Sequence, residues 1–291
     1  MTDTARTTTF TADSSAQTVL ASAREAWNYR EFITYLTKRD LRITYLRSYL
    51  GWLWSLLNPL AEMAIYSLVF GVILAVDRSL PDAPNDFSSF PHFLLSGMVV
   101  FNFYRASSSK VLNTFTSTVK LRRKLYFPPV APAISQVLTT LVTNSFELVL
   151  LFAFFAVVGH LSITAIVLIP AAFIATLYGL GVGLLISVAN SRYRDVGYLY
   201  SIFLRLFFYL LPIIWPLQFA RDRFGSDREW LLQIIVWNPM TKLISIGRDG
   251  MYLHRWPPAT DFVYVSLFGA VLLWLGWSVF ARSSADVAEG V

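Results

Sequence analysis

Stretches of apolar residues recur along most of this chain, each close to the about 20 residues that cross a bilayer as a helix. Six of them predict transmembrane helices, at about 52–76, 92–113, 132–158, 163–189, 197–217 and 260–281. The polar segments between them are short, except for residues 218–259, which are too many for a simple connector. The pattern therefore predicts an all-α integral membrane protein with one six-span domain at residues 52–281.

The segment before the first span is amphipathic. Residues 23–51 predict a helix lying in the membrane interface, because its apolar positions share one stripe and its cations occupy the other side. The cations expected to meet lipid headgroups are Lys38, Arg39, Arg42 and Arg47. Residues 1–22 and 282–291 predict cytoplasmic tails, of which the first is expected to be disordered.

The long segment between the fifth and sixth spans contains an apolar run, Trp230–Trp237, that is too short to cross a membrane. Asn238 and Pro239 follow it directly. One interpretation is a pair of re-entrant helices that dip back into the outer leaflet, where backbone must be covered by protein or face a water-filled cavity. The other is a subdomain lying on the outer surface, and both stay open here.

Composition and charge agree with a membrane protein and orient it. Hydrophobic residues make up 55% of the chain and charged residues 14%, against about a quarter charged in soluble domains. Placing both termini in the cytoplasm puts 14 of the Lys and Arg residues there and 7 on the other side. We therefore expect a multi-pass protein of the inner (plasma) membrane whose basic charge meets lipid rather than nucleic acid.

The sequence offers little for catalysis or metal binding. Cysteine is absent, which excludes disulfides and thiolate sites. The three histidines, His92, His160 and His254, are far apart in the sequence and flank predicted spans, so we expect no metal site. No Gly-x-x-x-x-Gly-Lys-Ser/Thr motif is present either, so we expect no cofactor in this chain. If ATP drives transport, a separate ATPase must contact a cytoplasmic loop, for which the basic segment Val119–Pro129 is the candidate.

Five ionisable residues fall inside the predicted spans. Each would cost at least about 2.5 kcal/mol at the bilayer centre, so each should face protein or water rather than lipid. They are Glu62, Arg105, Lys110, Glu147 and Arg205. Their predicted depths at about 1.5 Å per residue favour two ion pairs, Lys110 with Glu62 and Arg105 with Glu147. We favour structural ion pairs over a proton relay, because two isolated glutamates do not form a chain of carboxylates.

Residues around the start of the first span carry a family resemblance. Arg39-Asp40-Leu41, Tyr45, Ser48, Leu50-Gly51, Trp54 and Asn58-Pro59 occur in an order and spacing that resemble ABC exporter permeases of the polysaccharide class, the Wzm type. The resemblance implies a homodimer with two copies of a separate ATPase that binds ATP and Mg. It also implies export of a polyprenyl-pyrophosphate-linked glycan. Galactan exporters of actinobacteria are the members we expect to be nearest.

The same resemblance implies roles for three further groups of residues. A coupling helix that docks on the ATPase would contain Lys120, Arg122, Arg123, Lys124 and Tyr126. Aromatic rings lining a channel would be Phe101, Tyr104, Phe203, Phe207, Phe208, Tyr209 and Trp215. Gate helices would include Trp230, Trp237, Asn238 and Pro239. Phe and Tyr also pack helices together and face lipid, so sugar stacking remains one of two readings for the aromatic group.

Three alternatives compete with polysaccharide export. An ABC permease for a lipid or a drug would share the spans and the dependence on a separate ATPase. A proton-coupled carrier would transport without ATP. A membrane glycosyltransferase would need an acidic motif that binds a metal and a nucleotide, and the loops contain no Asp-x-Asp.

Overall fold

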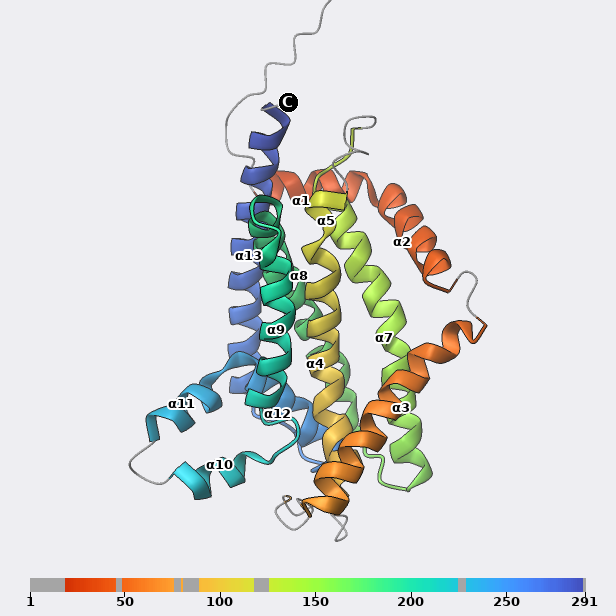
Figure 1. Ribbon diagram of the computed structural model, residues 1–291, viewed down its shortest axis with the longest axis vertical. Coiled ribbons are helices and arrows are strands. Elements are labelled where there is room, and N and C mark those ends of the chain that lie inside the picture. The colour runs from red at the N-terminus through yellow and green to blue at the C-terminus, as the bar shows by residue number, and fades with distance from the viewer. Residues whose placement is uncertain are drawn as a thin grey trace, which may run out of the picture.

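The computed structural model describes residues 19–45, 49–75, 80, 89–117, 126–224 and 229–289. Throughout this part of the chain every regular element is a helix, which confirms the predicted all-α class. The bundle consists of helices that run along the long axis of the molecule or, in the case of α3 (Trp54–Tyr66), slant across it (Figure 1). They are α3, α4 (Phe90–Leu112), α7 (Ala131–Val157), α8 (Leu168–Arg192), α9 (Asp195–Leu210) and α13 (Ala259–Glu289).

Short helices gather at the two ends of this bundle (Figure 1). At one, which we call the α2 end, lie α1 (Val19–Asn28), α2 (Arg30–Tyr45) and α5 (Thr114–Ser117). At the other, the α12 end, lie α10 (Leu217–Phe224), α11 (Glu229–Trp237) and α12 (Pro239–Met251). The two chain segments that enter and leave the bundle, α1 and the end of α13, therefore lie at the same end.

Four helical segments of the described chain are long and apolar enough to cross a membrane. They are Trp54–Ile73, Ala131–Val157, Ile163–Arg192 and Ala259–Ser284. They coincide with the first, third, fourth and sixth predicted spans. The second and fifth predicted spans correspond to α4 and α9, which lie alongside them in the bundle (Figure 1).

The predicted interface helix consists of two helices rather than one. It begins at Val19 and breaks at Tyr29. Residues 19–22 therefore belong to a helix, although they were predicted to be part of a disordered tail. The reason is tertiary contact, because Trp277 Nε1 of α13 donates to the buried hydroxyl of Ser22 (3.1 Å).

The inner face of α2 packs against protein. Ile33 and Leu36 are buried, and the hydroxyl of Thr37 donates to that of Ser135 on α7 (3.3 Å). Ile43, which was predicted to share the apolar stripe, is exposed. α2 therefore presents one face to α7 and leaves its cationic side uncovered.

The first span starts part-way along the bundle. Gly51 has a positive φ of 47°, a conformation that other residues adopt only under strain, and the chain turns there before α3 begins. α3 starts at mid-height and slants towards the α12 end (Figure 1). It continues as the π-helix η2 (Ser67–Ile73) and contains Pro59.

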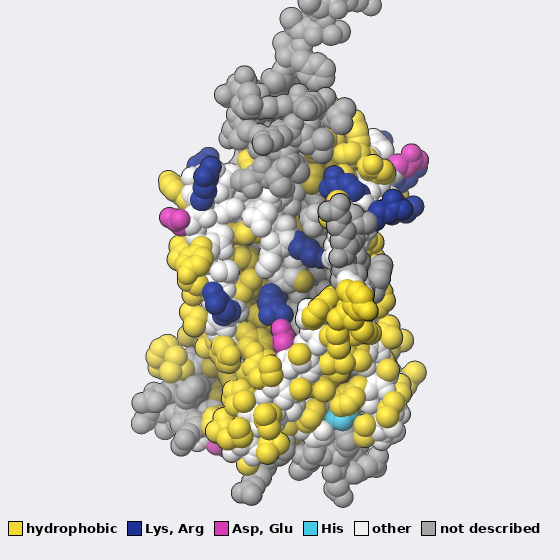
Figure 2. All heavy atoms as spheres, turned by 45° about the vertical axis from the view of Figure 1, so that its right-hand side comes forward, with side chains coloured by type: hydrophobic (Ala, Val, Ile, Leu, Met, Phe, Trp, Pro, Cys, Tyr) yellow, Lys and Arg dark blue, Asp and Glu magenta, His cyan; other side chains and the backbone are white. Residues whose placement is uncertain are grey.

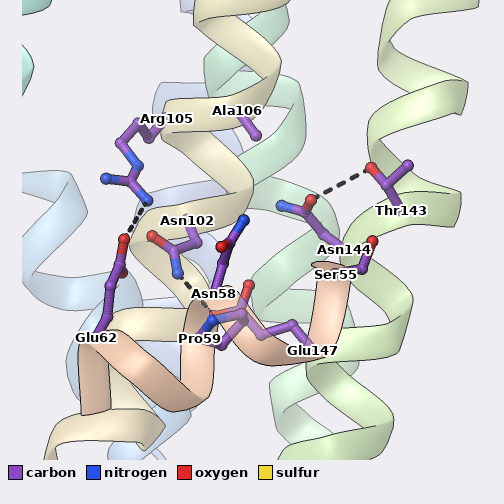
Figure 3. Close-up of a pocket in the computed structure, with 10 residues that line it drawn as sticks. All are labelled: Ser55, Asn58, Pro59, Glu62, Asn102, Arg105, Ala106, Thr143, Asn144 and Glu147. Carbon is purple, nitrogen blue, oxygen red and sulfur yellow. Dashed lines mark hydrogen bonds and ion pairs between the residues drawn. The ribbon is translucent and has the colours of Figure 1, made fainter. Parts of the chain in front are cut away.

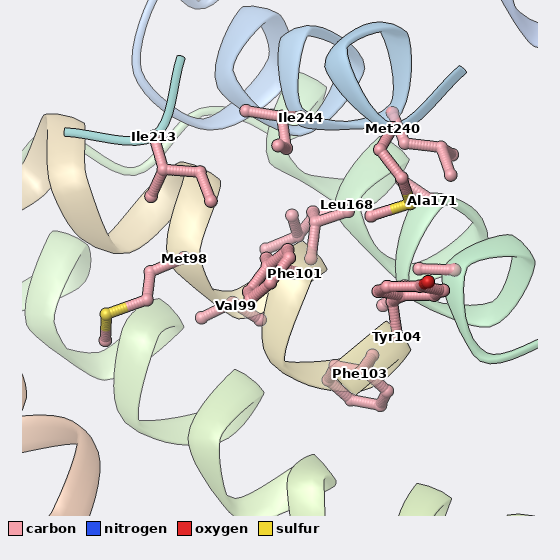
Figure 4. Packing of buried hydrophobic residues seen from close by; sticks show 14 of the residues in the cluster. Met98, Val99, Phe101, Phe103, Tyr104, Leu168, Ala171, Ile213, Met240 and Ile244 are labelled. Carbon is pink, nitrogen blue, oxygen red and sulfur yellow. The ribbon is translucent and has the colours of Figure 1, made fainter. Parts of the chain in front are cut away.

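α4 is the central helix of the molecule. All of its residues from His92 to Tyr104 are buried. Figure 4 shows Phe101 of α4 beside Leu168 of α8, with Ile244 of α12 above them, and all three belong to one hydrophobic cluster. A helix enclosed by protein needs no lipid-facing apolar surface, so it can carry buried polar residues such as Ser96 and Asn102.

Small residues bring α4 and α8 together. A Cβ atom at Gly179 of α8 would lie 2.5 Å from Cβ of Ser107 and 2.7 Å from the carbonyl oxygen of Tyr104. At Gly183, one turn further, it would lie 2.7 Å from Cβ of Val111. This Gly-x-x-x-Gly pair lets the two backbones touch, as small residues do between transmembrane helices. α8 is thus a fixed support behind α4.

α9 is shorter than the predicted span 197–217. It ends at Leu210, and Leu211 is extended with ψ 147°. Pro212 explains this end, because a proline disfavours helical geometry in the residue before it and cannot donate a backbone hydrogen bond. The helix therefore has 16 residues.

The long predicted connector folds into three helices. Asn238 caps α12, since its Oδ1 accepts from the backbone N–H of Met240 (2.9 Å), and Pro239 occupies the first turn. α12 is buried between α4, α8 and α13, whereas α11 keeps Trp230 and Trp237 exposed. After α12 the last helix runs to Glu289, past the predicted end of the span at 281.

Candidate functional site

A polar cavity of about 210 Å³ lies at mid-height of the bundle, between α3, α4 and α7 (Figure 3). We call it the α3 cavity. Its lining residues are Ser55, Asn58, Pro59, Glu62, Asn102, Arg105, Ala106, Thr143, Asn144 and Glu147. Eight of these ten side chains are polar or charged, although the three helices carry long apolar stretches on their other faces.

Two interactions organise the α3 cavity. Nη2 of Arg105 lies 3.6 Å from Oε1 of Glu62, and both side chains are partly exposed at the mouth. Deeper in, Nδ2 of Asn102 donates to Oε1 of Glu147 (2.7 Å), and these two side chains are 6% and 5% exposed. The other amide atom, Oδ1 of Asn102, is buried and accepts no hydrogen bond from the described residues.

The predicted ion pairs are therefore wrong in their partners. Arg105 pairs with Glu62, and Glu147 with an uncharged amide. The depth argument assumed that the first span starts at the same level as the others. Because α3 begins at mid-height, Glu62 reaches Arg105 instead of Lys110 (Figure 3).

A second cavity, of about 470 Å³, lies nearer the α2 end. We call it the α2 cavity, and its lining residues are Leu36, Arg39, Asp40, Ser109, Lys110, Asn113, Thr114, Pro132, Ser135 and Gln136. Asp40 accepts from Arg39 Nη2 (2.7 Å) and from Gln136 Nε2 (2.7 Å). Lys110 forms no hydrogen bond or ion pair with the described part of the chain. Its ammonium group can therefore interact with a ligand in this cavity, whereas Arg39 is already paired with Asp40.

Both cavities lie along the same faces of α4 and α7. On α4 the lining residues follow helical spacing from Asn102 through Arg105 and Ser109 to Asn113. On α7 they are Ser135 and Gln136 in the α2 cavity and, two turns further along, Thr143, Asn144 and Glu147 in the α3 cavity. The two helices thus present a polar track through an apolar bundle. The sequence prediction missed the α7 part, although the 3.6-residue period of Ser, Gln, Thr and Asn was its signal.

The fifth ionisable residue, Arg205, lies exposed on α9. Its Nε donates to the backbone carbonyl of Ser201 (3.4 Å). Figure 2 shows Lys, Arg and acidic side chains at mid-height on one side of the molecule, among hydrophobic ones. Charged groups at this level are too costly to face lipid. This side of the bundle therefore needs a protein or aqueous neighbour.

Comparison with known proteins identifies the family. The family model for ABC-2 type transporters matches residues 31–252, which include α2, both cavities and α12. The chain belongs to the ABC-2 type transporter family. It is a permease of that family, as the resemblance in its first span indicated.

Three relatives of this ABC-2 permease carry names from polysaccharide export. An O-antigen export system permease protein RfbA of Myxococcus xanthus is 28% identical over 92% of this chain and 98% of its own length. One of Klebsiella pneumoniae is 26% identical over 89% and 94%. A polysialic acid transport protein KpsM of Escherichia coli is 22% identical over 83% and 89%.

The cations predicted to meet lipid headgroups divide into two sets. Arg39 lines the α2 cavity of the permease and pairs with Asp40. Lys38 and Arg42 are exposed on α2 outside it. Arg47 lies outside the described residues.

The predicted channel aromatics also divide. Their role in lining a channel stays a prediction. Phe101, Tyr104 and Phe208 present almost no surface in this structure and pack in the core. The reason is that α4 is enclosed and α9 turns one face onto it. Phe207 and Trp215 are partly buried against the same core. Phe203 and Tyr209 are exposed on α9 and could contact a ligand.

The predicted coupling helix is described only at its end. Lys120, Arg122, Arg123 and Lys124 lie outside the described residues of the permease. The hydroxyl of Tyr126 donates to Oε1 of Glu25 on α1 (2.6 Å), and this hydrogen bond raises the pKa of the phenol to about 12. The end of this loop is thus attached to the interface helices.

Two features at the α12 end were not predicted. Arg248 of α12 is buried, donates to the carbonyls of Pro212 (2.8 Å) and Ile213 (3.1 Å), and stacks on Phe93. It therefore joins α12 to α4 and to the end of α9. Because Arg248 falls in a segment outside the predicted spans, no role in helix packing was predicted for it.

The histidines come together at the same end, contrary to their separation in the sequence. The rings of His160 and His254 are 4.0 Å apart, and Nε2 of His254 donates to the carbonyl of His160 (2.9 Å). Burial lowers the pKa of His160. In the described residues no three His, Cys, Asp or Glu side chains are arranged to hold a metal ion.

Proposed function

We propose that this ABC-2 permease is the transmembrane subunit of an ATP-driven exporter that moves a lipid-linked polysaccharide across the plasma membrane. It works as a homodimer with two copies of a separate ATPase, which binds ATP and Mg. The names of its relatives support the class of cargo. A galactan is the polymer that the family resemblance suggests.

The proposed topology has six spans and both termini in the cytoplasm. α4 has 23 residues, which at about 1.5 Å each make about 34 Å, enough to cross the about 30 Å hydrocarbon core. α9 is shorter, and the extended residues after it pack against the protein, where irregular backbone is tolerated at membrane depth. The excess of cations at the α2 end supports its cytoplasmic placement.

The observation that carries the proposal is the polar track along α4 and α7. A glycan is covered with hydroxyl groups and cannot cross hydrocarbon, so its exporter needs hydrogen-bonding groups through the bilayer. The track supplies amides, hydroxyls, carboxylates and a guanidinium from the α2 end to mid-height. A second copy facing this side would enclose a path between the two chains and remove Arg205 from lipid.

The same feature separates the proposal from export of an apolar drug. Drug-sized ligands bind in mostly apolar pockets of about 300–1,000 Å³. The α2 cavity reaches that size at about 470 Å³ and the α3 cavity does not at about 210 Å³, but both are lined mainly by polar residues. We also propose that α11 and α12 form a re-entrant gate. The exposed tryptophans of α11 and the buried face of α12 fit a helix pair held in the outer leaflet.

Reconstitution of the full chain with its ATPase in proteoliposomes tests this function. Lipid-linked glycan purified from the host membrane is placed in the outer leaflet of vesicles whose ATPase sites face outward. We expect ATP-dependent appearance of the glycan in the lumen and stimulation of ATP hydrolysis by the glycan. Vesicles with the ATPase alone are the control.

Translocation that continues without ATP in a proton gradient would contradict the proposal in favour of a carrier. Stimulation by apolar drugs but not by the glycan would contradict it in favour of a drug permease.

A further inference from the structure

We propose that the α3 cavity is a binding site for one sugar unit of the glycan, with Asn102 and Glu147 at its floor and Glu62 and Arg105 at its mouth. This inference rests on the proposed function and names the part of the cargo that this site holds. The site recognises hydroxyl groups, and the phosphates of the lipid bind elsewhere.

The floor of the cavity requires a hydrogen-bond donor. Asn102 is held in place because its Nδ2 donates to Glu147 (2.7 Å). This bond leaves Oδ1 of Asn102 as a buried acceptor with no partner among the described residues. Buried polar atoms are satisfied in the great majority of cases. Asn102 lines the cavity but its Oδ1 has almost no accessible surface, so an occupant donates to this acceptor after a small movement of the side chain. A sugar hydroxyl supplies this donor.

A hydroxyl group donates one hydrogen bond and accepts others, and the cavity offers both acceptors and donors to it. The carboxylates of Glu62 and Glu147 accept from O–H groups. The guanidinium of Arg105 and the amides of Asn58 and Asn144 donate to hydroxyl oxygens. A hydrocarbon chain would satisfy none of these groups.

The charges of this site disfavour phosphate. The one guanidinium in the lining, that of Arg105, is already paired with Glu62 at 3.6 Å. The other acid, Glu147, is buried and bonded to an uncharged amide. A diphosphate would therefore find no unpaired cation here, whereas neutral sugars need none.

Access and size agree with one sugar unit at a time. Arg105 and Glu62 are 44% and 37% exposed, so the cavity opens sideways on the face that carries the polar track. Its volume of about 210 Å³ equals about seven water molecules at about 30 Å³ each. A polymer passing along the track can place one ring in the cavity and exchange it for the next.

The test uses the complete permease–ATPase complex in nanodiscs and two probes. The first is the phosphate-free oligosaccharide that mild acid releases from the host's lipid-linked glycan, followed by saturation-transfer NMR. The second is the intact lipid-linked glycan, followed by stimulated ATP hydrolysis. We expect Asn102→Leu to weaken oligosaccharide binding at least tenfold. Inorganic pyrophosphate should not compete.

Substitutions at Glu147 separate hydroxyl binding from ion coupling. Glu147→Gln keeps an acceptor oxygen and should retain more oligosaccharide binding than Glu147→Leu. Equal loss in both, together with export that depends on a proton or cation gradient, would overturn the proposal. Thr139→Val is the matched control, because this buried hydroxyl of α7 donates to the carbonyl of Ser135 (2.9 Å) outside both cavities.

The two probes distinguish failure of the site from failure of the function. If the intact glycan stimulates ATP hydrolysis but the oligosaccharide shows no transfer, or binds Asn102→Leu normally, the cavity holds only water and the inference is wrong. If the intact glycan does not stimulate the wild-type complex, the proposed function itself is wrong.

Discussion

The α2 and α3 cavities lie on the same two helices but differ in charge and in what closes them. The α2 cavity is closed by α2 and contains Arg39, Lys110 and one carboxylate, so one positive charge remains. The α3 cavity is closed by α3, and its one cation, Arg105, is paired with Glu62, so no positive charge remains there. Under the proposed function, the first suits the diphosphate of the lipid and the second suits the sugars. The difference indicates that the diphosphate and the sugar units of the cargo are held at separate levels of the bundle.

The largest effect should come from displacing α4, because this helix lines both cavities. Gly179→Leu would force atoms into the contact between α8 and α4, where even a Cβ would lie 2.7 Å from the Tyr104 carbonyl oxygen. Overpacking costs about 1–3 kcal/mol and sometimes more, and we expect about 3 kcal/mol here because backbone must move. Thermal unfolding of the purified complex measures this, with Gly71→Ala as a control, because a Cβ at Gly71 would meet the Phe90 side chain only at an ordinary contact distance of 3.5 Å. Unchanged thermal stability would mean that α4 does not depend on α8.

The next effect should be confined to the α2 cavity. Lys110→Glu changes its formal charge by two units, and at about 1 kcal/mol per charge near a membrane surface this gives about 2 kcal/mol, or a ~30-fold loss in affinity for a polyprenyl diphosphate. Binding of the phosphate-free oligosaccharide should stay unchanged. Competition binding with both probes measures the two effects. Equal weakening of both would show that the cavities do not divide the cargo.

A smaller effect is expected for cations outside the cavity. Arg42→Gln together with Arg47→Gln removes two arginines from the interface region, and we expect a several-fold loss of glycan-stimulated ATP hydrolysis at about 1 kcal/mol per contact. Arginine contributes here by bidentate contacts to phosphate. If the variant instead loses its ATPase or its orientation in the membrane, these arginines have a structural role.

The smallest effect concerns the attachment of the loop before α7. Tyr126→Phe removes the hydrogen bond to Glu25 and should lower stability by less than about 1 kcal/mol, because the side chains are exposed. Since the folded pKa of Tyr126 is raised from 10.0 to about 12, the bond stabilises fully below pH 10 and is lost as the pH rises through about 12. The two proteins should therefore differ in unfolding temperature at neutral pH and converge in strong base. A constant difference at all pH values would exclude this bond as the cause.

The elements were predictable where local pattern decides them. Apolar length located the long helices. Asn238-Pro239 is a signal for a helix start, a capping residue followed by proline, but the prediction did not use it to place α12. Pro212 is a signal for the end of α9. The prediction extended the span to residue 217 because the apolar run continues past this proline.

The site was less predictable, because its partners are set by tertiary geometry. Glu62 pairs with Arg105 only because α3 begins at mid-height, which hydropathy does not encode. The aromatic rings of α4 became core because other helices enclose it, and composition cannot say which faces are covered. The polar period of α7 was present in the sequence and was outweighed by the apolar residues between.

Photo-crosslinking from inside the α3 cavity tests the central claim most directly. A crosslinking amino acid replaces Asn58, which lines the cavity, and a second variant carries it at Val149, which is exposed on another face of α7. The complete exporter is irradiated during ATP turnover with lipid-linked glycan, and the adducts are analysed by mass spectrometry. The account predicts sugar-containing adducts at position 58 that require ATP, and lipid adducts alone at position 149. Absence of sugar at position 58 in a complex that exports the glycan would contradict a polar path along α4 and α7.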